Sequence, residues 1–194
     1  MKETDEELVL YLKEEDSTSL PYRLKRIRFM VKAFSKENGY LVLPGGELSL
    51  HFFEEARLCY LNGQFIACVM LCQSLLEEIF RGLLRETGIM LDRDLNKAGF
   101  ETLTEEALKH ALITLSEAEA FHRLRSYRNK YVHPRPPSSV KWLPRRMLDE
   151  EKSILELTQA DAQEALAIMF KTIKRQPFWV QYHSNHNRGW KQNQ

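Results

Sequence analysis

The sequence predicts an all-α fold, an antiparallel bundle of four to six helices. Apolar residues recur at steps of three and four along most of the chain, which is the spacing of one helix face. Alternation typical of a strand is confined to residues 40–43. A length of 194 residues with 43% hydrophobic and 28% charged side chains suits one core. We expect an N-terminal helical extension over residues 1–46, the bundle over 47–176, and a flexible polar tail over 177–194.

Two helices are expected in the N-terminal extension, at residues 6–15 and 22–34. The intervening Ser-Thr-Ser-Leu-Pro segment favours a break, because Pro21 has no backbone N–H to donate within a helix. The sequence Pro-Gly-Gly at residues 44–46 then interrupts the chain before the bundle.

The first two bundle helices have the clearest apolar pattern. The segment 47–61 has an apolar face, followed by the helix-ending Asn62-Gly63, and the face consists of Leu50, Phe53, Ala56 and Tyr60. The segment 64–87 is more regular, with Phe65, Val69, Cys72, Leu76, Ile79 and Leu83 on one face. Gly82 within it costs about 1 kcal/mol relative to alanine. We therefore expect another helix to pack closely against Gly82.

Two capping boxes predict where the following helices begin. In this motif a Ser or Thr side chain caps the helix and a Glu three residues later bonds back to the capping residue. Thr102 with Glu105 and Ser116 with Glu119 have this spacing. We expect one helix to begin at each pair.

The helix that begins near residue 116 should end at Val132. Pro134 disfavours helical geometry at the residue before it, which is His133. A last helix is expected over residues 158–174, with a buried face of Ala162, Leu166, Met169, Phe170 and Ile173.

Cysteine usage and the N-terminal residues predict a cytoplasmic protein that does not enter a membrane. Cys59, Cys68 and Cys72 are an odd number of cysteines within apolar helical patterns, which favours reduced thiols in the core. The first residues are acidic and lack the features of a secretory signal. The apolar stretch at 65–76 is about half the length that spans a bilayer.

The net charge of +1 conceals a separation of acids and bases along the chain. Residues 121–147 contain no Asp or Glu but eight basic residues. We interpret this block as an anion-binding face, whereas the second acid-free run, 23–36, fits a solvated helix face equally well. The residues we expect to contact RNA are Arg123, Lys130, Arg135, Lys141, Trp142, Arg145 and Arg146, with the indole ring of Trp142 able to stack on a base.

The basic block contains a motif suited to chemistry on RNA. Arg125, Asn129 and His133 are four residues apart and share one helix face, Arg128 lies beside that face, and Leu124, Tyr127 and Tyr131 form a neighbouring face toward the core. An imidazole can move a proton to or from a ribose hydroxyl, and a guanidinium can bind phosphate oxygens. RNA supplies its own nucleophile, the 2′-OH, so we expect no metal and no cofactor.

One imidazole is too few for a reaction that requires both a base and an acid. A two-fold dimer that apposes two copies of the motif helix would supply two histidines and at least two arginines. The motif therefore predicts a homodimer.

The segment Leu-Arg-Ser-Tyr-Arg-Asn-Lys-Tyr-Val-His-Pro at residues 124–134 resembles the motif of HEPN domains (higher eukaryotes and prokaryotes nucleotide-binding). In that motif an Arg and a polar residue precede a His, with four to six residues between the Arg and the His. The segments 54–65 and 75–77 resemble the preceding helix pair, so the resemblance covers about residues 47–134 and extends to 158–174 as a closing helix.

The resemblance implies a dimeric helical bundle that cleaves RNA without a metal or binds RNA or nucleotides. Carried over by position, Arg128 and His133 are catalytic and Asn129 orients them, while Glu77 and Arg125 support the site. An antitoxin or a protein of a defence system is the implied partner. The chain departs from one subgroup, because Arg135 stands where that subgroup has a Tyr.

Three interpretations of the motif stay open at this point. The chain is a metal-independent endoribonuclease, a catalytically silent module that binds RNA, nucleotides or a protein partner, or a helical adaptor in which the motif is a structural hydrogen-bond network. Cleavage that His133→Ala abolishes distinguishes the first from the others.

Overall fold

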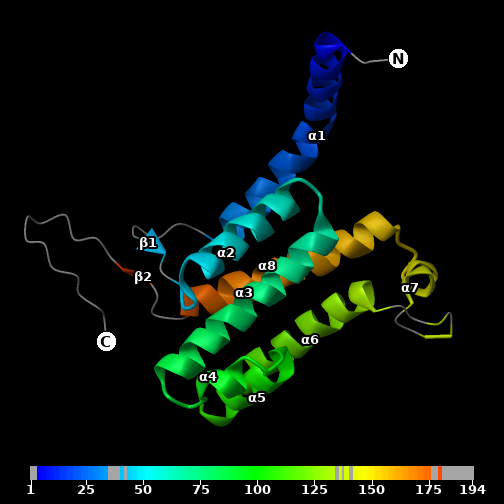
Figure 1. Ribbon diagram of the computed structural model, residues 1–194. Helices are drawn as coiled ribbons and strands as arrows, with labels where there is room; N and C mark the ends of the chain where they lie inside the picture. Colours follow the sequence, from blue (N-terminus) through cyan, green and yellow to red (C-terminus); the bar gives the residue numbers. More distant parts are fainter. Residues whose placement is uncertain are drawn as a thin grey trace, which may run out of the picture.

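The computed structural model describes residues 4–34, 40–41, 43–133, 136, 138–139, 142–175 and 179–180. These residues form eight α-helices and two strands of two residues each (Figure 1). The prediction of an all-α fold is confirmed. The predicted tail at 177–194 lies outside the described residues, apart from the two residues of strand β2.

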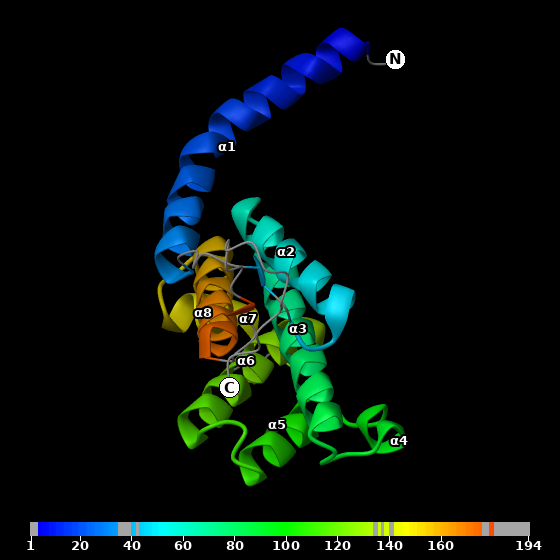
Figure 2. The ribbon, with the colours of Figure 1, turned by 90° about the vertical axis from the view of Figure 1, so that its left-hand side faces the viewer.

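The N-terminal helix α1 (Asp5–Ala33) is continuous, so the predicted break at residues 17–21 is wrong. Pro21 lies inside the helix, where it removes a backbone hydrogen bond without stopping propagation on either side. Figure 2 shows that α1 bends along its length, as expected of a helix that contains proline. Thr4 and Glu7 form a capping box at its start.

Within the described residues, the C-terminal part of α1 is the part that packs on the bundle. Arg26 donates a 2.9 Å hydrogen bond to the carbonyl of Leu61, and its guanidinium lies 5.0 Å from the ring centre of Phe65. Met30 is buried, whereas the first half of the helix projects away from the bundle (Figure 2). Beyond α1, strand β1 (Tyr40–Leu41) pairs antiparallel with β2 (Trp179–Val180).

Helices α2 (Gly46–Leu61) and α3 (Phe65–Glu86) form a hairpin through Gly63, whose φ of 81° lies in the left-handed region. The predicted apolar face of α2 is confirmed at three of its four positions. Leu50 is 42% exposed, and the buried residue at this end of the helix is Ser49, whose hydroxyl donates to the Pro44 carbonyl at 2.6 Å.

Gly82 of α3 packs closely, but against a turn and not against a helix. A Cβ at this position would lie 2.7 Å from Cβ of Pro44 and 3.0 Å from the amide nitrogen of Gly45. Glycine is therefore required here because the turn that precedes α2 crosses the surface of α3.

Short helix α4 (Asp92–Leu95) leads to α5 (Phe100–Lys109) and α6 (Leu115–Val132). Both helices begin earlier than their predicted capping boxes. Helix α5 begins after Gly99, three residues before Thr102 and with no side-chain cap, and α6 begins after Thr114, two residues before Ser116.

The observed starts of α5 and α6 bury apolar residues on both sides of the cap. At α6 these residues are Ile113 and Ala118, which occupy the positions of a hydrophobic staple, and Thr114 with Glu117 forms the capping box between them. A start after Ser116 would put Leu115 in the first staple position, and Leu115 is exposed.

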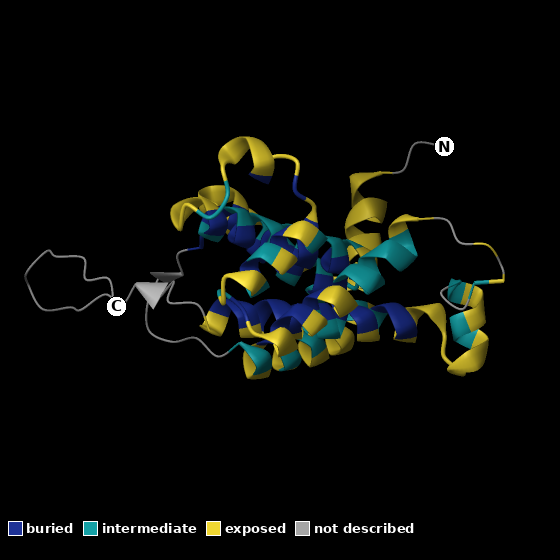
Figure 3. Cartoon of the chain, turned by 90° about the horizontal axis from the view of Figure 1, so that it is seen from below, coloured by how far each residue is buried: buried dark blue, intermediate teal, exposed yellow. Residues whose placement is uncertain are grey.

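Helix α7 (Leu143–Asp149), which the sequence pattern did not predict, precedes α8 (Ile154–Arg175). Helix α8 begins four residues earlier than predicted, and its five expected core residues are all buried. The bundle consists of α2, α3, α5, α6 and α8, with α3 in contact with the other four. Figure 3 shows the buried residues gathered within this bundle. No helix in the described part of the chain is both long and apolar enough to cross a membrane.

Candidate functional site at the end of helix α6

The last two turns of α6 carry the motif, and their inner face packs on the core as the sequence predicts. Leu124 is fully buried, and Tyr127 and Tyr131 are partly buried against the core. These three side chains fix the rotation of the helix, so that the remaining positions of the motif lie on its outer side.

Two tyrosine hydroxyls attach the end of α6 to α8. Tyr131 donates a 2.7 Å hydrogen bond to Oδ2 of Asp161, and one turn earlier Tyr127 donates to Oε2 of Glu164. Burial, followed by these bonds to carboxylates, raises the pKa of both tyrosines well above the ordinary value. Both hydroxyls therefore stay protonated and remain donors over the physiological pH range.

Asp161 also attaches α7 to this end of the bundle. Arg146 donates from its two terminal nitrogens to the two carboxylate oxygens at 2.9 and 3.2 Å, and its Nε lies 3.2 Å from Glu150. Burial opposes the charge on Arg146, but the bonds to Asp161 and Glu150 outweigh burial and raise its pKa. The carboxylate of Asp161 thus joins α6, α7 and α8.

The acid-free block of the sequence is not acid-free in space. Acids of α5, α7 and α8 approach its arginines, with closest distances of 2.7 Å for Arg125–Glu101, 2.9 Å for Arg146–Asp161, 3.1 Å for Arg123–Glu164 and 3.5 Å for Arg145–Asp149. These carboxylates pair with four of the eight basic residues that the linear pattern assigns to an anion-binding face. Arg125, predicted to support the motif, is held by α5 instead of by Asn129 or His133.

Arg128 differs from the other described arginines of the block, because no carboxylate of the described residues pairs with it. One terminal nitrogen donates to Oδ1 of Asn129 at 3.2 Å and lies 3.5 Å from Nε2 of His133. His133 is exposed and caps α6 with extended backbone angles, φ −109° and ψ 124°, as Pro134 leads us to expect. The structure therefore brings together the three residues predicted to be catalytic.

The other predicted site residues lie apart from this group or outside the described residues. Lys130 lies over the ring of Tyr127, with Nζ 4.7 Å from its centre, and Trp142 is the partly buried residue that precedes α7. Arg135 and Lys141 lie outside the described residues.

Glu77, predicted to support Arg128, makes its bonds within α3. Its carboxylate accepts from Gln73 at 2.7 Å and lies 3.7 Å from Arg81. Within the described part of the chain, Glu77 has no hydrogen bond or ion pair with Arg128.

Asp161 and Glu164 are the site residues that the sequence pattern did not identify. A signal for Asp161 was present, because it lies four residues from both Leu157 and Ala165, on the buried face of α8. An acid at an apolar position of an amphipathic helix requires a partner, since a buried unpaired charge is costly. Here the partners are a tyrosine and an arginine from two other helices.

No family model, no curated protein and no solved structure matches this chain. Among the described residues, no three His, Cys, Asp or Glu side chains are grouped so that they could hold a metal ion.

The contact between Arg128 and His133 is compatible with proton transfer. A guanidinium can only donate, so a hydrogen bond between them requires the imidazole tautomer that has its proton on Nδ1 and a lone pair on Nε2. An imidazole in this state can accept a proton from a substrate. The adjacent guanidinium can bind an anionic group of the same substrate, such as a phosphate.

Proposed function

We propose that the chain is a metal-independent endoribonuclease of the HEPN type, which cleaves RNA at a dimeric site built from Arg128, Asn129 and His133. The observation that carries the proposal is the 3.5 Å contact of His133 with an arginine that no carboxylate of the described residues neutralises. Every other described arginine of the basic block is paired with an acid.

In the proposed reaction, Nε2 of His133 accepts the proton of a ribose 2′-OH as that oxygen attacks the adjacent phosphorus. Arg128 binds the phosphate oxygens, on which negative charge increases in the transition state. The bond from phosphorus to the 5′-oxygen breaks, and that oxygen takes a proton from the partner subunit's His133. The products are a 2′,3′-cyclic phosphate and a 5′-hydroxyl.

A second copy of the chain is part of the proposal, because one motif supplies one imidazole. RNA as substrate, a cytoplasmic location, and an antitoxin or defence-system protein as partner belong to it as well. In such a system the ribonuclease acts as a toxin or as an effector against phage.

The test is cleavage of structured and single-stranded RNA in EDTA by the protein and two histidine variants. We expect His133→Ala to lower the rate by about 10²- to 10⁴-fold, the usual contribution of a general acid or base. His122→Ala is the matched control, because His122 is exposed on the same helix, three turns from the site. It should leave the rate unchanged.

Cleavage that persists in His133→Ala would refute the assignment of that residue. RNA binding that weakens with salt and survives His133→Ala, with no cleavage by any variant, would identify the chain as a silent binding module instead.

A further inference from the structure

Helix α1 has an exposed apolar stripe that nothing in the described structure covers. Four side chains at spacings of four, three and four residues are between 40% and 63% exposed, and they are Leu20, Leu24, Ile27 and Val31. This is the spacing at which helices pair in coiled coils. An exposed row of large apolar residues on a projecting helix indicates a contact with another molecule.

The stripe faces away from the bundle. At 100° per residue, its mean direction is about 140° around the helix axis from that of the residues which pack on the bundle. Those packed residues are Arg26, Phe29, Met30 and Ala33. A helix that docks on the stripe therefore does not meet the bundle of the same chain.

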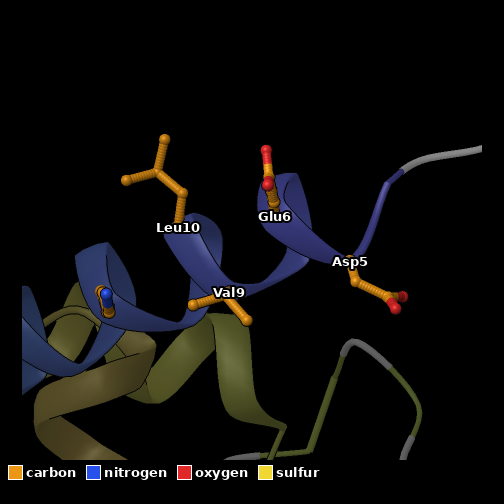
Figure 4. A pocket seen from close by; sticks show the side chains of 5 residues that line it. Asp5, Glu6, Val9 and Leu10 are labelled. Carbon is orange, nitrogen blue, oxygen red and sulfur yellow. The ribbon is translucent and has the colours of Figure 1, made fainter.

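The same spacing extends the stripe toward the N-terminus through Ser17, Lys13 and Leu10 to Glu6. Figure 4 shows Glu6 and Leu10 one turn apart, with their side chains directed to the same side of α1. Together with Asp5, Val9 and Lys13 they line a shallow hollow. The whole of α1, about 43 Å at 1.5 Å per residue, can thus take part in one contact.

The charges of α1 are divided between its two halves. Between residues 5 and 16 there are six acids and one base, whereas residues 17–33 contain five bases and no acid. Two copies of α1 in parallel would place like charges opposite each other. Two antiparallel copies place the acidic half of each helix against the basic half of the other.

We infer that α1 pairs antiparallel with α1 of a second copy of this chain, through the stripe. The two-fold axis passes between Thr18 and Ser19, so that Leu10 faces the partner's Ile27 and Lys13 faces the partner's Leu24. The aliphatic part of a lysine can cover a leucine while its charge stays in water.

In this register the flanking charges are complementary as well. Glu7 lies opposite the partner's Arg28, and Asp16 lies opposite the partner's Arg23. Within one chain Asp16 and Arg23 are already 2.7 Å apart, so in the pair they become a cluster of four charges around the two-fold axis. The pairing does not rest on the proposed ribonuclease function, because Arg128 and His133 are on another helix.

The first experiment measures association by sedimentation over a range of protein concentrations. We expect Leu24→Glu to raise the dissociation constant by at least about a hundredfold, because two copies each lose an apolar side chain and gain a charge on the stripe. Lys25→Glu introduces the same side chain one position away, off the stripe, and should change association little. Circular dichroism then checks that each variant keeps the helical content of the parent.

The second experiment tests the antiparallel register through charge. Asp16→Arg alone and Arg23→Asp alone should each weaken self-association, because each homodimer then opposes like charges. An equimolar mixture of the two variants should associate again, since the arginines of one chain face the acids of the other. Glu15→Arg and Lys25→Asp, at positions directed away from the stripe, provide the matched controls.

The mixture separates pairing between chains from effects within one chain, because each variant keeps its own like-charged pair at positions 16 and 23. Each of three results would overturn the inference. The parent protein does not self-associate, Leu24→Glu leaves its association unchanged, or the mixture of Asp16→Arg and Arg23→Asp associates no more strongly than either variant alone.

Discussion

Asp161→Asn should be among the most destabilising single-atom changes in the described structure. Its carboxylate accepts from Tyr131 and from two nitrogens of Arg146, and the side chains of Asp161 and Arg146 are 6% and 13% exposed. Asparagine keeps one acceptor oxygen, but it presents an NH₂ group to donors and leaves the guanidinium without its buried countercharge.

The magnitude follows from the burial of the pair. Breaking a buried ion pair by removing one partner costs about 3–5 kcal/mol. Arg146 retains Glu150, and asparagine retains part of the hydrogen bonding, so we expect the lower end of this range, about 3 kcal/mol. For a chain of this size that corresponds to a fall of roughly 6–12 °C in Tm.

Glu164→Gln is the matched control on the same helix. Like Asp161, Glu164 accepts hydrogen bonds from one tyrosine and one arginine, which here are Tyr127 and Arg123 of α6. Unlike the buried pair, however, the side chains of Glu164 and Arg123 are 40% and 53% exposed. A surface ion pair contributes about 0–1 kcal/mol. The free energies of unfolding of the two variants are measured in urea by circular dichroism. If Asp161→Asn and Glu164→Gln lower the free energy of unfolding by amounts within about 0.5 kcal/mol of each other, burial does not set the strength of these ion pairs.

Three further changes test local features of the fold. Gly82→Ala should lower stability by about 1–3 kcal/mol in thermal unfolding, because the new Cβ meets Pro44 at 2.7 Å, and a stabilised variant would show that the turn yields freely. Thr114→Ala should cost about 1 kcal/mol by removing the capping box with Glu117, whereas Thr114→Ser should be nearly neutral. Burial raises the pKa of Tyr60 to about 12, above the value near 10 that tyrosine has in the unfolded chain. Below pH 10 both states hold the proton and the free energy of unfolding is unaffected. As the pH rises from 10 toward 12 only the unfolded state loses the proton, so the free energy of unfolding falls by about 1.4 kcal/mol per pH unit. Absorbance titration of Tyr60→Phe should lack one late-ionising tyrosine, and a titration identical to that of the parent would contradict this assignment.

Periodicity predicted the helices that build the bundle, because burial of one face leaves a regular mark in the sequence. Helices α2 and α3 and the end of α6 lie within a residue or two of their expected positions, and the five core residues of α8 are buried. Helix starts were predicted less well. At α6, Thr114 and Ser116 both have the spacing of a capping box, and the choice between them depends on which apolar neighbours the tertiary fold buries. At α5 the cap is Gly99, which has no side chain that a capping pattern could identify.

Pro21 shows a second limit of local patterns. The prediction assumed that proline ends a helix, but the residues on both sides continue α1 and the chain accepts a bend.

The proximity of Arg128, Asn129 and His133 could be predicted from the sequence, but the partners of the neighbouring charged residues could not. The grouping of Arg128, Asn129 and His133 follows from helical spacing. The neutralisation of neighbouring arginines does not, because their acids come from other helices, such as Glu164, which is 41 positions from Arg123. A linear charge pattern cannot show which side chains of distant segments become neighbours.

The sharing of one carboxylate by Tyr131 and Arg146 couples two segments that belong to different parts of the chain. Tyr131 lies in the turn of α6 between Arg128 and His133, and Arg146 belongs to α7, so the position of this turn and the position of α7 depend on the same side chain of α8. A substitution in α7 that shifts Arg146 would therefore act on the motif through Asp161, without touching Arg128 or His133.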